Sequence, residues 1–148
     1  MKYLDFINDE NIKNSIEGSL EQNILELEKK LRFNIPQALR EYLALMGEKT
    51  IYRGFDYHGT KDMYELYDWI FELINDYRSK GIKIEEIKLA LPFDKFQDTF
   101  FYVPIEQENE NPPVYAFDIN DTPTIRKLNN SFTEFVKERY EKKLNELM

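Results

Sequence analysis

Apolar residues recur with a helical period in four segments of the chain. Ser19 and Gln22 form a capping box, which predicts the start of the first helix. Pro36 suits the first position of a second helix, and Gly47 suits the residue after its end. These two helices are expected to face the core through Ile24, Leu27, Leu31, Leu39, Tyr42, Leu43 and Met46. The polar segment Met1–Gly18 before them predicts a loosely held lead-in with at most a helical turn.

The clearest helical pattern runs from Asp62 to Lys80, and Gly81 ends it. One face of this helix is apolar and consists of Met63, Leu66, Tyr67, Ile70, Phe71, Leu73, Ile74 and Tyr77. The opposite face is acidic and consists of Asp62, Glu65, Asp68, Glu72 and Asp76. A last helix begins after the capping box of Ser131 and Glu134, with an apolar stripe from Phe132 to Leu147.

Strand patterns lie mainly between the third and the last helix. Four segments are rich in β-branched and aromatic residues: Lys88–Phe93, Thr99–Pro104, Pro113–Asp118 and Thr124–Leu128. Thr50–His58 adds a strand or hairpin piece, and polar connectors such as Asp94–Asp98 are typical of turns. Such closely spaced strands predict an antiparallel meander. The order of elements favours an α+β fold, with helices on one face of a mainly antiparallel sheet of about four to six strands.

Composition narrows the functional classes. The 148 residues fit a single domain spanning 1–148, with a core of about residues 19–147. The chain lacks Cys, a signal-peptide pattern and an apolar run long enough to span a bilayer, which favours a cytoplasmic protein without a membrane partner. The net charge of −8 argues against direct binding of nucleic acid.

Catalytic and metal-binding patterns are absent from the sequence. His58 is the only His, and it is expected to be a partly exposed strand or loop residue. Asp118–Asp121 lacks the Gly and the distant Glu of a calcium loop, so an Asx-turn explains it better. We therefore expect no catalytic residue, no cofactor and no metal, and hence no enzyme.

Two acidic features stand out from this background. The first is the acidic face of the third helix, with Trp69 at its border, where the indole either roofs the edge of the core or anchors an interface. The second is the base-free stretch Phe96–Ile125, which holds six acids and no Lys or Arg. We expect these acids to lie largely on one exposed surface, because burying unpaired carboxylates is costly. Either feature is a binding surface or simply a solvated exterior.

Three segments, taken in order, resemble the SUKH superfamily, which includes the fungal cell-wall assembly regulators of the Smi/Knr type. The first segment has Glu28-x-x-Leu31, Ile35-Pro36-x-x-Leu39 and Tyr42-Leu43-x-x-Met46-Gly47, similar to the family's opening helices. The second has Leu91-Pro92-Phe93, Phe100-Phe101-Tyr102-Val103 and Asn111-Pro112-Pro113-Val114-Tyr115-Ala116-Phe117, similar to its central strands. The third, Asn130-Ser131-Phe132-x-x-Phe135, resembles the start of its terminal helix. Family members often carry a Gly-containing turn where this chain has Asp94–Asp98.

The resemblance implies helices packed on a curved antiparallel sheet and a non-enzymatic protein-binding role. Many bacterial members are immunity proteins that neutralise a cognate toxin, often a nuclease, and fungal members are regulators or scaffolds. The first hypothesis is therefore an immunity protein bound to a basic toxin domain, and the alternative is a regulatory or scaffold domain. The candidate partner-binding residues are Glu65, Asp68, Trp69, Glu72, Asp98, Tyr102, Glu106, Glu108, Glu110 and Asp118.

Overall fold

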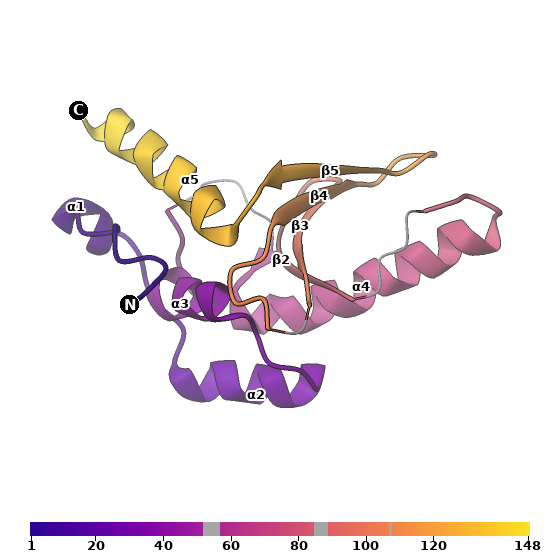
Figure 1. Ribbon diagram of the computed structural model, residues 1–148, viewed down its shortest axis with the longest axis horizontal. Helices are drawn as coiled ribbons and strands as arrows, with labels where there is room; N and C mark the ends of the chain where they lie inside the picture. Colours follow the sequence, from indigo (N-terminus) through magenta and orange to yellow (C-terminus); the bar gives the residue numbers. More distant parts are fainter. Residues whose placement is uncertain (52–56, 85–88, 107) are drawn as a thin grey trace.

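The computed structural model describes residues 1–51, 57–84, 89–106 and 108–148. It has an α+β fold in which helices pack against an antiparallel sheet (Figure 1). The helices are α1 (Glu10–Lys13), α2 (Glu21–Leu31), α3 (Gln37–Met46), α4 (Gly59–Ser79) and α5 (Phe132–Leu147). The strands are β1 (Tyr57–His58), β2 (Ala90–Phe96), β3 (Thr99–Pro104), β4 (Val114–Asp118) and β5 (Thr124–Asn129).

The sheet is the predicted antiparallel meander, with the strand order β1-β2-β3-β4-β5. The predicted bounds of β3 are confirmed, and those of β4 and β5 differ by one residue. Of the predicted strand Thr50–His58, residues 52–56 lie outside the described residues, and Tyr57–His58 forms β1. The polar segment Asp94–Asp98 is mostly strand, because β2 continues to Phe96.

Helices cover both faces of the sheet, which corrects the expectation of one covered face. Side chains of successive residues in β3 point to opposite faces. Phe100 and Tyr102 pack with α4, whereas Phe101 and Val103 pack with α3 and α5. We call these two buried clusters the α4 core and the α3–α5 core. Figure 1 shows α4 running along the lower side of the sheet and α5 leaving at the upper left.

The N-terminal segment is part of the fold and is not loosely held. Leu4, Ile7 and Ile12 are buried in the α3–α5 core. The carboxylate of Glu41, on α3, accepts hydrogen bonds from the backbone N–H groups of Tyr3 (2.9 Å) and Leu4 (3.1 Å). The sequence analysis missed this attachment because the charged residues of the segment mask its few apolar positions.

The two predicted capping boxes have different outcomes. Ser131 caps α5 by accepting a hydrogen bond from the N–H of Glu134 (3.2 Å), as predicted. Ser19 does not cap α2, which begins after Leu20, and its hydroxyl donates to Glu48 instead (3.0 Å). The Ser19 hydroxyl also lies close to Gly47, where a Cβ would lie 2.2 Å from it. Gly47 is therefore needed for this approach, and its φ of −63° is not the left-handed value expected after a helix end.

A β-bulge in β2 sets the directions of two charged side chains. Pro92 pairs with Tyr102 and Asp94 with Phe101, so Phe93 is the extra residue between them. Phe93 and Asp94 therefore both face the α3–α5 core, and Lys95 faces the α4 core, because a bulge shifts the alternation by one residue. Pro92 lies inside the strand next to the bulge.

Candidate functional site

The acidic face of α4 is exposed, as the sequence pattern predicted. Glu65, Asp68, Glu72 and Asp76 all have exposed side chains. Among the described residues, none of the four forms an ion pair. From Glu65 to Asp76 this stripe extends about 16 Å along the helix. It is a row of negative charge beside the α4 core, without an ion pair in the described ranges.

Trp69 lies at the edge of the α4 core. Its indole packs edge-on against the rings of Tyr57 (5.8 Å between centroids) and Phe100 (5.5 Å). The ammonium of Lys95 lies 4.7 Å from the centroid of the indole. The residue is half-buried, so it roofs the core edge, one of the two roles considered for it.

Tyr102, the other aromatic candidate, lies inside the protein. Its side chain is 4% exposed and its ring stacks on Tyr115 at 5.5 Å. Its position on β3, facing α4, explains this burial. A partner docking on the described surface would reach Tyr102 only through rearrangement of the α4 core.

Most acids of the base-free stretch are exposed, but they do not form one surface. Five of its six acids are exposed: Asp98, Glu106, Glu108, Glu110 and Asp121. The β2–β3 and β4–β5 turns meet at one end of the sheet, where the N–H of Ile119 donates to the carbonyl of Asp98 (2.8 Å). We call this the turn end. The β3–β4 loop, which holds the three Glu residues, lies at the opposite end, because consecutive antiparallel connections alternate.

We call the opposite end of the sheet, which holds the β3–β4 loop, the loop end. There, Glu110 has a structural role. Its carboxylate accepts a hydrogen bond from the N–H of Gln37 (2.7 Å), and its carbonyl accepts one from the N–H of Ala38 (2.9 Å). These are donors of the first turn of α3, which lack partners within the helix. Glu106 and Glu108 lie on the same loop, and Glu108 adopts a positive φ of 68°.

Asp118 is neutralised within the fold. Its carboxylate accepts from Arg126 Nε (2.8 Å), Thr99 Oγ1 (2.7 Å) and Thr124 Oγ1 (3.2 Å). The Arg126 guanidinium, helped by both hydroxyls, lowers the pKa of Asp118 from its ordinary value. This candidate residue therefore ties three strands together and offers little free charge.

A hollow of about 480 Å³ lies at the turn end, beside the last turns of α4. Its apolar lining includes Leu73, Ile82 and Ile119, which are partly exposed. Three exposed carboxylates from three separate elements line it as well: Asp76 of α4, Asp98 of the β2–β3 turn and Asp121 of the β4–β5 turn. The structure thus joins one end of the acidic stripe to part of the base-free stretch.

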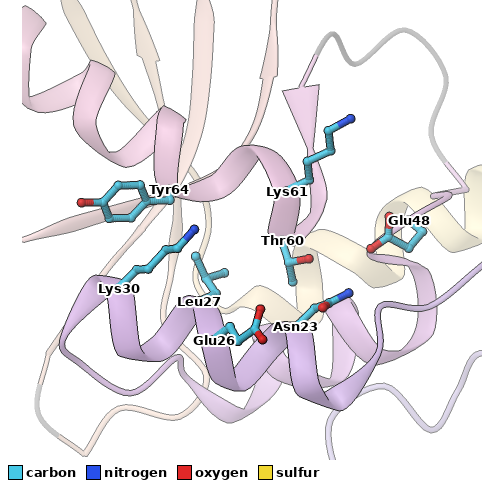
Figure 2. A pocket seen from close by; sticks show the side chains of 8 residues that line it. All are labelled: Asn23, Glu26, Leu27, Lys30, Glu48, Thr60, Lys61 and Tyr64. Atoms are coloured by element: carbon cyan, nitrogen blue, oxygen red, sulfur yellow. The ribbon is translucent and has the colours of Figure 1, made fainter.

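A second hollow, of about 440 Å³, lies between α2 and the start of α4 (Figure 2). Figure 2 shows Glu26 and Lys30 from α2 facing Thr60 and Tyr64 from α4. The Lys30 ammonium lies 5.8 Å from the centroid of the Tyr64 ring. Its lining carries both signs of charge, so it has no clear preference for a charged partner.

Two charged residues that the sequence placed in a turn are buried. Asp94 is fully buried and accepts a hydrogen bond from the Tyr42 hydroxyl (3.0 Å), and its Oδ1 has no hydrogen-bond partner. Burial raises the pKa of Asp94 well above its ordinary value, against the lowering effects of the Tyr42 hydrogen bond and the Arg139 charge. Lys95 is 6% exposed, with its ammonium near Trp69 and donating to the Gln97 carbonyl.

The sequence indicated Asp98 and the stripe, but it did not indicate that they converge. The missing information was the packing of the β2–β3 turn against the β4–β5 turn. That packing brings Asp121 and Ile119 to the same hollow as Asp76. The β2–β3 turn contains no Gly, and Gln97 adopts a positive φ of 52° in it.

Other chemistry is sparse in the part of the chain that the structure describes. No group of three or more potential ligands among these residues is placed to hold a metal ion. His58 is partly exposed, and its Nε2 lies 3.1 Å from the carbonyl of Glu48. No helix in the described ranges is both long and apolar enough to cross a membrane.

Comparison with known proteins identifies the family. No curated protein and no solved structure matches the chain significantly. The family model described as SMI1 / KNR4 family (SUKH-1) matches residues 18–138, which is more than half of the chain. That span covers α2 to the first turns of α5, including the bulged sheet and both acidic features. The chain therefore belongs to the SMI1/KNR4 family (SUKH-1).

Proposed function

We propose that this protein is an immunity protein that binds and neutralises a cognate toxin with a basic surface. Membership of the SUKH-1 family carries the proposal, because its domains are commonly protein-binding immunity proteins and are generally non-enzymatic. The net charge of −8 and the acidic stripe on α4 support a basic partner. Such a field accelerates encounter with a basic protein and opposes binding to nucleic acid.

A nuclease fits this description, because its substrate cleft is basic. Carboxylates on α4 would occupy the place of the substrate phosphates, so the toxin would lose access to nucleic acid. The regulatory role of other family members remains the second candidate, since family membership is consistent with either role. In that role the same surface would join two proteins of the cell without blocking an activity.

The test is neutralisation of the toxin encoded beside this gene. The toxin domain would be expressed with and without this chain, and cell survival and the toxin's activity in vitro would be measured. We expect survival only with co-expression, and a stable one-to-one complex whose formation slows as salt rises. If the neighbouring toxin is fully active in excess of this protein, the immunity role is wrong. A cellular protein bound in its place would then favour the regulatory role.

A further inference from the structure

The hollow at the turn end combines exposed carboxylates with an apolar lining. Leu73 of α4, Ile82 after it and Ile119 of the β4–β5 turn are partly exposed there. They continue the α4 core outward, where Tyr77 closes its end by donating a hydrogen bond to the carbonyl of Asn120 (2.8 Å). A concave apolar surface of this kind suits a ligand that carries aliphatic groups.

The negative charge that lines the hollow favours a positively charged ligand. Asp76, Asp98 and Asp121 are exposed, and within the described ranges none of them has an ion pair. Lys80 also lines the hollow, so three carboxylates face one ammonium. Asp118, on the neighbouring strand, is by contrast neutralised by Arg126. Carboxylates without an ion pair to a described residue and partly exposed apolar side chains therefore meet in this hollow.

Resting on the proposed function, we infer that this hollow is where the partner is anchored, by a basic segment with long side chains. A Lys or Arg side chain has both required parts: an aliphatic stem for Leu73, Ile82 and Ile119, and a cation for the three carboxylates. The stripe on α4 then faces the basic surface of the partner, and the hollow anchors one basic segment of it. The carboxylates of the loop end take no part in anchoring.

The probes are two blocked peptides that differ only in stem length. One is acetyl-Gly-Lys-Lys-Lys-Gly-amide, and the other replaces each Lys by 2,4-diaminobutyrate, which keeps the charge and shortens the stem. Each is titrated into the isotope-labelled full chain at low salt, and backbone amide shifts are followed by NMR. We expect the Lys peptide to shift Ile82, Asp98, Ile119 and Asp121, and to bind about fivefold more tightly than the short-stem peptide.

A pair of double variants gives the matched control. Asp98→Asn with Asp121→Asn removes two charges at the turn end, and Glu106→Gln with Glu108→Gln removes two at the loop end. We expect the first to weaken the Lys peptide about fivefold and the second to change binding less than twofold. Equal weakening, equal affinity of the two peptides, or shifts centred on Glu65 and Asp68 would overturn the inference. Thermal melting confirms that each variant is folded.

The cognate toxin separates this inference from the proposed function. If the toxin is neutralised and the loop-end variant is the one that loses affinity, the anchoring site is wrong and the immunity role stands. If no toxin is neutralised but the Lys peptide seats in the hollow as expected, the immunity role fails and the anchoring chemistry stands. Both measurements use the full chain.

Discussion

The α3–α5 core and the α4 core lie on opposite faces of one sheet, and the first holds many more buried side chains of the described residues. Partly exposed apolar side chains border both cores. On the first face, Phe93, Phe132 and Phe135 are all 0% exposed. The N-terminal segment, held by the Glu41 carboxylate, adds further cover there. On the second face, the core continues into partly exposed Leu73 and Ile119 at the turn end.

Charged side chains are buried beside both cores, and Lys95 is the buried one that faces the α4 core. In the α3–α5 core, charged side chains such as Glu41 and Asp94 are buried and hydrogen-bonded to the fold. Around the open end of the α4 core, Asp76, Asp98 and Asp121 extend into solvent. The larger α3–α5 core therefore contributes more buried area, and the end of the α4 core presents charge beside apolar surface. The predictions below test this division.

The largest expected effect is on the enclosed face. Phe93→Ala removes a ring that contacts Tyr42, Phe132 and Phe135, and we expect it to lower the free energy of unfolding by about 3–5 kcal/mol. Trp69→Ala, at the edge of the other face, should cost about 2 kcal/mol, because its indole is half-buried. Chemical denaturation with a common m-value measures both. A larger loss for Trp69→Ala would contradict the division.

The second effect is a dependence of stability on pH that comes from Asp94. Burial raises its pKa in the folded protein, so the folded state holds this proton after the unfolded chain has released it. The contribution of Asp94 to the free energy of unfolding is therefore most favourable at acidic pH. It decreases as pH rises above about 3.9, the ordinary pKa of an aspartate, by at most about 1.4 kcal/mol per pH unit.

Asp94→Asn is the matched variant, because it keeps the shape and removes the ionisation. The difference in unfolding free energy between variant and wild type should grow in favour of the variant from pH 4 to pH 7. Other groups around the carboxylate, Tyr42 on α3, Arg139 on α5 and His58 on β1, are common to both proteins and cancel in this difference, apart from any direct coupling to Asp94. A difference that is constant with pH would show that Asp94 ionises normally.

Much of the fold was predictable, because helical and strand periods survive in the sequence wherever one face is buried. The stripes of α4 and α5 and the strand β3 are examples. The incorrect predictions concern residues whose conformation depends on a partner that is distant in the sequence. The hydroxyl of Ser19 donates a hydrogen bond to Glu48 instead of capping α2. The bulge at Phe93 turns the side chain of Asp94 toward the α3–α5 core. Neither partner is visible from local spacing.

The acidic character and the exposure of the candidate site were predictable from the sequence, but the arrangement of its residues was not. Exposure of the acidic stripe follows from its helical phase, so Glu65, Asp68 and Glu72 could be placed correctly. The division of the base-free stretch follows from which connections share an end of the sheet, and this requires the strand order. The capping of α3 by Glu110 links residues far apart in the chain, and no local pattern indicates it.

The smallest expected effect is the stability change on removing the open carboxylates. Asp98→Asn with Asp121→Asn removes charges that have no ion pair in the described structure, so we expect a change within about 0.5 kcal/mol. We expect any change to be a slight gain in stability, because neighbouring carboxylates repel each other. Thermal and denaturant unfolding at low salt would measure it, with Asp118→Asn as the comparison. Asp118→Asn should lose more stability at neutral pH than in strong acid, because the contacts that lower the pKa of Asp118 favour its ionised form. A loss above about 1 kcal/mol for the double variant would assign these acids to the fold and not to a partner.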